Sequence, residues 1–404
     1  MPAGVTAGAP ARGGHPAPDA ALQRWLRAAG RHPARGPVSV PVDSAVGRVL
    51  AAPVHARRSS PWFTCAAMDG VAVRTDDVRA EGAVTLGARR SDVVDTGDLV
   101  PAGSDTVVPV EDVESCGDGV TLRGPVTPGC HVRAIGEDVV EGSLMLPAGH
   151  RLRPQDLAAV AATGHRTLLV HHTPRVTVIP TGDELRPLGA ALAQGEITES
   201  NSIMLAARLR ELGARPSVTG IVADRPCRLV AALRDAATAA DVLVVLAGSS
   251  AGRDDHTASV VDSCGETVVH GVAMRPGHPT VLGVLWRGGT TVPVLGLPGY
   301  PVAAAIALEV FGVAMLATLE GGAARPEAFV EAVLQRTVHS SLDVEEWVRV
   351  RVEDGPLAVS MPGGASVLSG LVAAHGLLRV PAGVGEVAAG TSVRVRLFGG
   401  DPPS

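Results

Sequence analysis

Lysine is absent from this 404-residue sequence, so every fixed positive side chain is an arginine. Reactions that pass through a lysine Schiff base are therefore excluded, because a guanidinium stays charged and cannot act as an amine nucleophile. Aromatic residues are also scarce, at 2% of the chain. We attribute both shortages to a composition biased towards Ala, Gly, Val, Arg and Pro rather than to function.

Cysteine is rare, and its number is odd. The five cysteines include no CxxC pair, which suits buried or incidental thiols better than a disulfide framework or a zinc site. A reducing compartment, the cytoplasm, fits this usage best. The cysteines are Cys65, Cys116, Cys130, Cys227 and Cys264.

A basic excess and long apolar runs are missing as well. The net charge of −6 argues against a general nucleic-acid binder and favours a small ligand. No run of about 18 uninterrupted apolar residues occurs, so no membrane span is expected. Residues 1–18 are rich in Ala, Gly and Pro and lack an apolar core after a basic start, which predicts a disordered tail rather than a signal peptide.

The chain is nevertheless rich in apolar residues, at 46%, with 19% charged, so it can bury enough surface to fold. Its length predicts roughly two to three domains. Helical spacing over residues 19–29 predicts an opening amphipathic helix. Short apolar runs separated by Gly, Pro and Asp predict a β-rich domain over residues 46–139.

From residue 175 to about 325, apolar strands alternate with helical segments, which predicts a doubly wound α/β domain with a parallel sheet. Residues 326–404 return to alternating strands and predict a C-terminal β domain. Residues 19–45 and 140–174 are assigned to an extended, partly helical linker domain. In a doubly wound domain, ligands bind at the carboxyl ends of the strands.

Acidic and glycine-rich segments follow three of these strands. Asp183 and Glu184 of TGDEL follow the first strand, although an acidic turn is also a common helix N-cap. Asp224 is expected at the end of the second strand. The third runs into AGSSAGRDDHT, where small residues and carboxylates suit a phosphate and Mg²⁺, although glycine-rich strand ends are common. The third segment contributes Gly248, Ser249, Ser250, Gly252 and Asp255.

Two proline-rich turns and one β-loop complete the candidates. GLPGYP, with Pro298 and Pro301, joins a strand to a helix whose N-terminus can face an anion, or it is a plain structural turn. In MRPGHP, Arg275 and His278 flank a turn and can contact an oxyanion, although His278 can equally be a surface histidine. Asp69 of AMDGVAVR is a candidate functional residue in a polar loop, although an ordinary polar β-turn also explains an aspartate there.

Taken in order, these segments resemble the MoeA family, which includes the gephyrin E domain. The resemblance spans roughly residues 40 to 397 and is far more specific than any single motif. The matching strings are SPWFTCAAMDGVAVR, DTGDLVPAGSDTVVPVEDV, IGEDVVEGSLMLPAGHRLRP, RVTVIPTGDEL, GEITESNSIMLAARLRELGA, MRPGHP, GLPGYPVAA and GASVLSGLVAAHGLLRVPAG.

The resemblance implies a MoaB/MogA-like α/β domain, a β-rich module and a C-terminal β-barrel-like module. It also implies a homodimer, with the site between the α/β domain of one subunit and the MDG module of the other. The family reaction takes adenylylated molybdopterin and molybdate, uses a divalent ion such as Mg²⁺, and yields molybdenum cofactor and AMP. A MogA-like adenylyltransferase is the implied partner.

Residue by residue, the resemblance implies catalytic or positioning roles for Asp69, Thr96 and Glu184, and a cation at Asp224 and Asp255. The glycines and serines of residues 248–252 would bind the substrate. The resemblance implies that the substrate is also bound by Arg275, His278, Pro298 and Pro301.

Departures from the family pattern gather around the oxyanion. Both lysines of the usual MKPGKP are replaced, by Arg275 and His278, and the usual GNPVS reads Tyr300, Pro301, Val302 and Ala303. The usual GR pair is Asp343 and Val344, and the Asn of ANGL is His375. Separately, the phosphate loop is atypical, because the usual SGGVSVG reads AGSSAG. Around the oxyanion, Arg275 can retain positive charge, whereas Val344 offers none. Losing one charge-assisted contact costs on the order of 1.5 to 3 kcal/mol, so these changes predict weaker molybdate binding.

Three hypotheses follow. The chain is a molybdenum insertase with a compensated anion site, or a MoeA-like paralogue acting on a nucleotide-linked substrate in another pathway. Alternatively, it is a non-catalytic dimeric scaffold.

Overall fold

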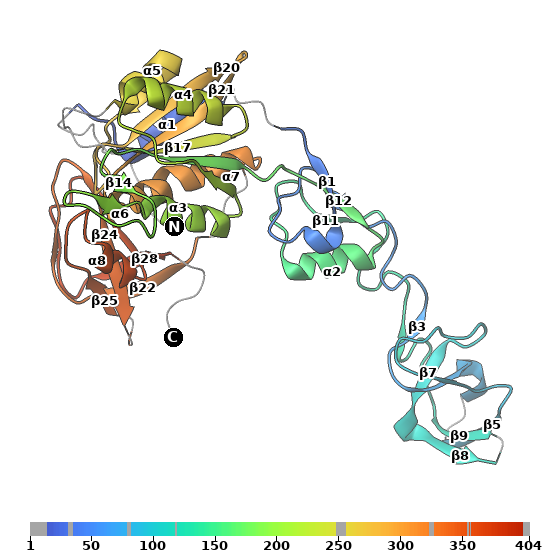
Figure 1. The fold of residues 1–404 in the computed structure, drawn as a ribbon. Helices are drawn as coiled ribbons and strands as arrows, with labels where there is room; N and C mark the ends of the chain where they lie inside the picture. Colours follow the sequence, from blue (N-terminus) through green and yellow to red (C-terminus); the bar gives the residue numbers. More distant parts are fainter. Residues whose placement is uncertain are drawn as a thin grey trace. The chain divides into compact units, whose positions relative to one another are not determined.

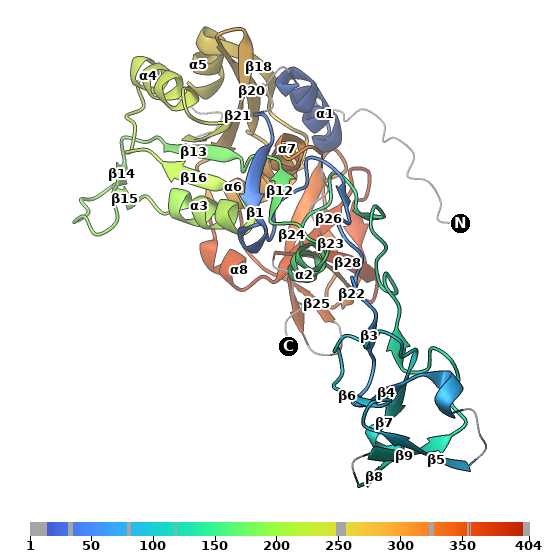
Figure 2. The same ribbon diagram turned by 90° about the vertical axis from the view of Figure 1, so that its right-hand side faces the viewer.

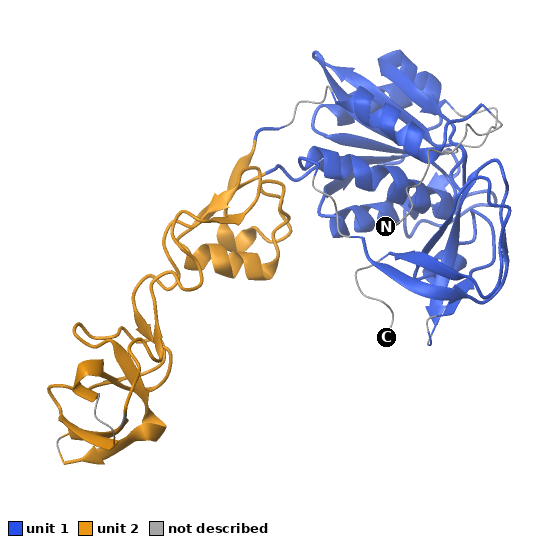
Figure 3. Ribbon diagram, turned by 180° about the vertical axis from the view of Figure 1, so that it is seen from behind, with its two compact units in different colours: residues 1–36, 171–404 blue, residues 37–170 orange. Residues whose placement is uncertain are grey.

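The computed structural model describes residues 14–30, 35–78, 82–117, 119–247, 256–322, 327–353, 355 and 357–398. The chain forms two compact units, which Figure 3 colours separately. Unit 1 contains residues 1–36 and 171–404, and unit 2 contains residues 37–170. Each unit is described by itself.

A six-stranded sheet in the order β16-β13-β17-β21-β20-β18 forms the centre of unit 1 (Figure 1). The neighbours from β16 to β21 are parallel, whereas β20 and β18 run antiparallel to the strands beside them. The parallel strands end along one edge, where β13 ends at Pro180, β16 at Val218 and β21 at Pro298. The expectation that Asp224 ends the second strand is wrong, because β16 stops at Val218 and the chain reaches Asp224 through a loop that touches Thr181 at Val222. The strands are β13 (Arg175–Pro180), β16 (Arg215–Val218), β17 (Val242–Ala247), β18 (Gly265–His270), β20 (Val281–Arg287) and β21 (Thr290–Pro298).

Helices cover both faces of this sheet because its central strands are apolar on both sides. In β17, Val242 and Val244 belong to the core with Trp25, whereas Leu243 and Val245 belong to the core with Leu233. This alternation confirms the predicted doubly wound domain. The helices are α1 (Pro18–Ala29), α3 (Asn201–Glu211), α4 (Pro226–Ala237), α5 (Thr257–Cys264), α6 (Pro301–Ala307) and α7 (Val313–Leu319).

One long helix runs from Pro301 to Leu319, because the π-helical turn η4 (Leu308–Gly312) joins α6 to α7. By length and composition it could cross a membrane, but 61% of it is buried inside unit 1. Its Glu309 pairs with Arg208 at 2.6 Å and with Arg396 at 3.1 Å. The helix is therefore part of the core of the unit.

A five-stranded barrel follows in the C-terminal part of unit 1. Its strands pair in the order β24-β25-β22-β28-β26, and β26 returns to β24, which closes the barrel as the family resemblance implied. The short β19 adds to β24 in parallel. The elements are β19 (Met274–Arg275), β22 (Phe329–Leu334), β23 (Val338–His339), β24 (Glu345–Glu353), β25 (Leu357–Ser360), α8 (Leu368–Val372), β26 (Gly376–Val380), β27 (Glu386–Val387) and β28 (Ser392–Leu397).

Unit 2 is rich in short strands (Figure 2). Two three-stranded sheets, β6-β4-β7 and β5-β9-β8, confirm the predicted β-rich module. Helix α2 packs with the pairs β1–β12 and β2–β11 around Leu50 and Val160. The elements are β1 (Val38–Pro41), β2 (Val54–His55), β3 (Cys65–Ala66), β4 (Gly70–Val73), β5 (Gly82–Gly87), β6 (Asp92–Val94), β7 (Thr106–Pro109), β8 (Val113–Cys116), β9 (Gly119–Gly124), β10 (Val132–Arg133), β11 (Leu144–Leu146), α2 (Pro154–Ala162) and β12 (Thr167–Val170).

The opening helix α1 packs against the six-stranded sheet, where the indole N–H of Trp25 donates to the carbonyl of Gly283 at 2.8 Å. Residues 1–13 of the expected tail lie outside the described residues. The segment just before α1 contacts the loop at 271–280, since the carbonyl of Pro16 accepts a hydrogen bond from the Ala273 N–H. The sequence-based domain boundaries stay a prediction.

Candidate functional site

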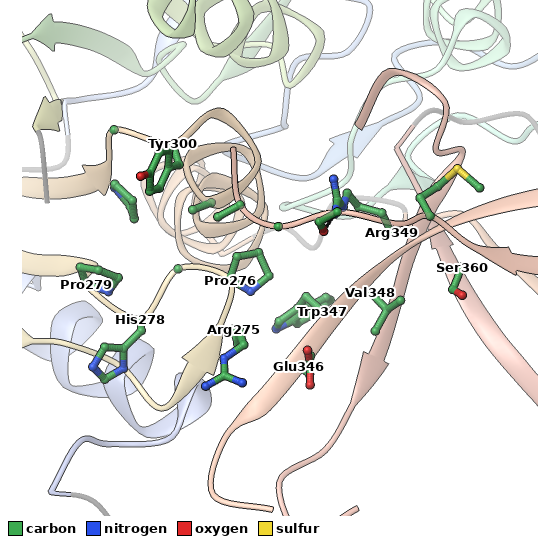
Figure 4. Close-up of a pocket in the computed structure, with 18 of the residues that line it drawn as sticks. Arg275, Pro276, His278, Pro279, Tyr300, Glu346, Trp347, Val348, Arg349 and Ser360 are labelled. Atoms are coloured by element: carbon green, nitrogen blue, oxygen red, sulfur yellow. Dashed lines mark hydrogen bonds between the residues drawn. The ribbon is translucent and has the colours of Figure 1, made fainter. Parts of the chain in front are cut away.

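A cavity of about 1020 Å³ lies in unit 1, between the carboxyl edge of the sheet and the barrel (Figure 4). The sheet side contributes Glu184 and the turn that leads into α6, and the barrel side contributes β24. Six residues singled out from the sequence line this cavity together, which are Glu184, Arg275, His278, Pro298, Tyr300 and Ala303.

The loop at 271–280 supplies one wall with Arg275 and His278. It is tied to the barrel because Arg275 in β19 lies in register with Glu346 in β24. Nδ1 of His278 lies 2.8 Å from the carbonyl oxygen of Val272, and the Val272 N–H donates to the His278 carbonyl at 2.8 Å. Both side chains are exposed, so each is accessible to a ligand.

Arg349 on β24 lines the opposite wall, and the sequence had not marked it. It is only 6% exposed, and it donates to the carbonyl oxygens of Gly363 and of Val367, the latter at 3.0 Å. The hydrogen bonds and ion pairs of the described residues give it no carboxylate partner. Burial lowers the pKa of its guanidinium. A buried cation without a counter-charge is costly, so this wall suits an anion.

One sequence signal could have revealed Arg349. In EEWVRVRVE, alternate residues of a strand share a face, so Arg349 lies on the same face as Trp347. Both residues are buried and line the cavity. Arg351 shares this face by the same spacing but is exposed, so burial rather than the sequence pattern separates the two arginines.

The turn after β21 places the start of α6 at the cavity. Pro298, Gly299 and Tyr300 line it, and Asn201 holds the turn by donating to the Gly299 carbonyl at 2.7 Å. The N–H of Val302 donates to the Ala365 carbonyl at 3.1 Å, which fastens the helix start to a loop of the barrel. Pro301, at the first helical position, is not among the described residues that line the cavity.

Three carboxylates gather near the ends of β13 and β16. Glu184 reaches the cavity, while the Asp224 N–H donates to Oδ1 of Asp183 at 3.2 Å. Burial raises the pKa of Asp224 above its ordinary value, and the nearby Glu184 and Asp183 raise it further, against a hydrogen bond from Thr181. Such mutual repulsion favours a nearby cation. The close approach of Gly182 matters here, because a Cβ atom on it would lie 2.9 Å from the Glu184 carboxylate.

A metal site is not complete within the described part of the chain. Among those residues no group of three or more His, Cys, Asp or Glu could hold an ion. The predicted ligand Asp255 and the predicted phosphate-binding residues Gly248, Ser249, Ser250 and Gly252 lie outside the described residues. Their placement therefore stays a prediction, as does that of a cation at Asp224.

In unit 2, Asp69 and Thr96 lie together. Oδ1 of Asp69 accepts the Thr96 N–H at 2.6 Å and the Thr96 hydroxyl at 2.7 Å. These hydrogen bonds, the backbone one first, lower the pKa of Asp69. The exposed carboxylate is thus held ionised in a fixed orientation, as a positioning or activating group requires.

Three family models match successive parts of the chain. They describe the MoeA N-terminal region (domains I and II) at residues 17–164, a probable molybdopterin binding domain at 177–318 and the MoeA C-terminal region (domain IV) at 331–398. Together these matches follow the order that the sequence motifs predicted.

Relatives and solved structures match nearly the whole chain. Molybdopterin molybdenumtransferase 2 of Mycobacterium tuberculosis is 36% identical over 89% of this chain and 94% of its own length. Molybdopterin molybdenumtransferase of Nostoc is 30% identical over 87% of this chain and 86% of its own length. The crystal structure of the molybdopterin biosynthesis MoeA protein from Pyrococcus horikosii superimposes with a TM-score of 0.82 at 30% identity, covering 95% of this chain and 99% of that one.

Proposed function

This chain belongs to the MoeA family, and from its cavity we propose that it transfers molybdate to adenylylated molybdopterin and releases AMP, as a step of molybdenum cofactor biosynthesis. The observation that carries the proposal is Arg349, a buried guanidinium in the wall of a cavity large enough for a nucleotide-linked pterin. An anion in that cavity would give it the counter-charge it lacks.

We propose that molybdate binds between the two walls of the cavity. Arg275 and Arg349 supply fixed positive charge, and His278 supplies a further nitrogen donor when protonated. Pro298 and Pro301 set the start of α6, which brings Gly299, Tyr300 and Ala303 to the cavity. Arg349 supports the hypothesis of a compensated anion site, because its charge remains although Val344 offers none.

We propose that the phosphoanhydride of the substrate binds at the carboxyl ends of the parallel strands. There, backbone N–H groups of Gly248, Ser249, Ser250 and Gly252 are proposed to hold phosphate oxygens. Asp224 and Asp255 would hold Mg²⁺, and the raised pKa of Asp224 among its carboxylate neighbours fits a position made for a cation. The ion would supply charge neutralisation at the phosphoanhydride as AMP leaves.

Glu184 is proposed to orient the reacting groups from the sheet edge, since it alone of the three carboxylates lines the cavity. Asp69, held by Thr96, is proposed to contribute from a second copy of the chain. The proposed working form is therefore a homodimer. We further propose that it is cytoplasmic and that a MogA-like adenylyltransferase supplies its adenylylated substrate. The domain boundaries given above are part of the same proposal.

The test is AMP release from adenylylated molybdopterin in the presence of Mg²⁺, with and without molybdate. We expect release that depends on molybdate in the wild type and is lost in Asp255→Ala. In Arg349→Met, the molybdate concentration for half-maximal release should rise by about tenfold or more, because a charged hydrogen bond contributes on the order of 1.5 to 3 kcal/mol.

The other outcomes would contradict the proposal in different ways. Release that is indifferent to molybdate would indicate a paralogue acting in another pathway. Substrate binding without turnover would indicate a scaffold.

A further inference from the structure

Tyr300, the only tyrosine of the chain, has a fixed main chain and an exposed side chain. It lies just before α6, and its carbonyl accepts the Ala304 N–H at 2.9 Å. The carbonyl of the preceding Gly299 accepts a hydrogen bond from the side chain of Asn201 at 2.7 Å. The phenol ring, by contrast, is 59% exposed and lines the cavity. In the described part of the chain, no hydrogen bond or aromatic contact involves this ring.

Tyrosine is an unfavourable residue for the start of this helix. The N-cap position prefers Ser, Thr, Asp or Asn, because their side chains accept a backbone N–H of the first turn. The family pattern GNPVS has Asn here, whereas this chain has Tyr300, which makes no capping hydrogen bond. The chain is also poor in aromatic residues, at 2%. Helix formation therefore does not explain the phenol ring, and its place in the cavity leaves a ligand as the reason for it.

The same cavity has a second aromatic residue, Trp347, which comes from β24 on the barrel side (Figure 4). Trp347 is only 8% exposed, and the guanidinium of Arg379 lies over its ring, 5.8 Å from the centroid. Arg379 is itself held by Glu345 at 2.6 Å. Pro276 lines the cavity as well. The cavity thus combines an exposed aromatic ring with a fixed wall of aromatic and proline side chains, which suits a flat ring in the ligand.

The substrate assigned above carries two flat heteroaromatic rings, the pterin and the adenine. Molybdopterin binds its metal through two sulfur atoms on the side chain of the pterin, so the pterin lies near the oxyanion. Tyr300 lines the same cavity as Arg275 and Arg349, which we place beside molybdate. The adenine lies beyond the phosphoanhydride, which we place at the carboxyl ends of the parallel strands. The pterin is therefore the ring that belongs beside Tyr300.

We propose that Tyr300 binds the pterin end of the substrate, with the phenol ring stacked on the face of the pterin. The inference rests on the proposed function, because it takes the ring from the substrate named there. It makes Tyr300 a determinant of affinity that acts on the ring of the substrate, whereas Arg275 and Arg349 act on negative charge. Loss of one stacked aromatic side chain weakens the binding of a flat base by about fivefold or more.

The experiment is calorimetric titration of the full chain with two probes, molybdopterin under anaerobic conditions and AMP. Each probe carries one phosphate group, but the first has a pterin and the second an adenine, so the comparison assigns the ring. Tyr300→Phe keeps the aromatic ring, Tyr300→Ala removes it, and Tyr300→Asn replaces it with a capping side chain. Trp286→Ala is the matched control, because Trp286 is 66% exposed and is not among the described residues that line this cavity.

We expect Tyr300→Ala and Tyr300→Asn to raise the Kd of molybdopterin by about fivefold or more. Tyr300→Phe and Trp286→Ala should keep it within about twofold of the wild-type value. The Kd of AMP should be the same in all four variants. Tyr300→Asn should also raise the Tm, because Asn caps α6. Stability and pterin binding then change in opposite directions, which a purely structural role of Tyr300 would not produce.

An unchanged Kd of molybdopterin in Tyr300→Ala, or absence of molybdopterin binding by the wild type, would overturn the inference. An equal loss in Tyr300→Phe would assign the effect to the hydroxyl, and a loss of AMP affinity instead would assign the ring to the adenine, so either result would overturn it too. Binding that does not depend on Tyr300, with intact molybdate-dependent AMP release, leaves the proposed function standing. Molybdopterin binding that depends on Tyr300, without AMP release, leaves the inference standing and removes the proposed function.

Discussion

Gly370 lies so close to Arg349 that a Cβ atom on it would stand 2.9 Å from Nη1 of the guanidinium. The same atom would be 3.0 Å from the carbonyl oxygen of Pro362, so it has no room on either side. Gly370 lies in α8, packed against the group that we place beside the anion. The absence of a side chain there is therefore a requirement of the site as well as of the packing.

Gly370→Ala should weaken anion binding, because the guanidinium must shift from the position in which its two carbonyl partners hold it. Stability should change by only about 1 kcal/mol, since the crowding is offset by the better helix propensity of Ala. Calorimetric titration with molybdate and chemical denaturation measure the two effects. Gly220→Ala is the matched control, because its Cβ would meet nothing within 4 Å. Equal affinity in both variants would contradict the assignment of Arg349.

The alternation of apolar strands with helical segments predicted the α/β architecture. The strands are recognisable as apolar runs because successive residues of each central strand point to two faces that are both buried. The apolar stretch DVLVVLAG became β17, with Val244 on one face and Val245 on the other. The antiparallel strands β18 and β20 and helix α5 were not predicted. Their segments lie between the glycine-rich stretch and the last parallel strand, where the sequence offers no regular alternation of strand and helix.

The cavity was predicted only in part. Arg275, His278, Glu184 and Pro298 were found because each follows a strand or flanks a turn, and turns at one sheet edge come together. Arg349 was missed because it lies in the middle of a strand and reaches the cavity only through barrel closure. Closure depends on the pairing of β26 with β24, which is set by contacts between residues far apart in the chain.

Thr96→Val should raise the pKa of Asp69 only part of the way to its ordinary value. The substitution removes the hydroxyl donor but leaves the backbone N–H, which is the larger cause of the lowered pKa. Carbon-detected NMR titration of the Asp69 carboxyl measures the change, with Thr96→Ser as the control that retains a hydroxyl. A pKa that does not move would show that the hydroxyl contributes nothing to holding the carboxylate.

Glu309→Ala should destabilise unit 1 by about 1.5 to 3 kcal/mol, because it removes the buried carboxylate shared by Arg208 and Arg396. Each arginine then keeps only a more exposed partner, Glu211 for Arg208 and Glu327 for Arg396. By contrast, Glu114→Ala removes the exposed pair with Arg123 and should cost less than about 1 kcal/mol. Chemical denaturation followed by fluorescence and by circular dichroism compares them. Similar costs for the two variants would mean that Glu309 does not join the long helix to the barrel.

Asp224→Asn should stabilise the protein at neutral pH while abolishing the stimulation of AMP release by Mg²⁺. Burial and neighbouring carboxylates raise the folded-state pKa of Asp224, so its ionised form opposes folding once pH exceeds that value. Asparagine carries no charge, so it removes this unfavourable contribution to the free energy of folding. The stabilisation should therefore disappear in acid, below the unfolded-state pKa of about 3.9, where the carboxyl is protonated in both states.

Thermal unfolding at neutral and acid pH, together with AMP release over a range of Mg²⁺ concentrations, tests this combination. Asp235→Asn, on the exposed side of α4, should leave AMP release unchanged. A residue kept only for structure would give the opposite pattern, a loss of stability with Mg²⁺ stimulation intact. Gain of stability with loss of metal response is the outcome expected of a carboxylate whose unfavourable position serves to hold a cation.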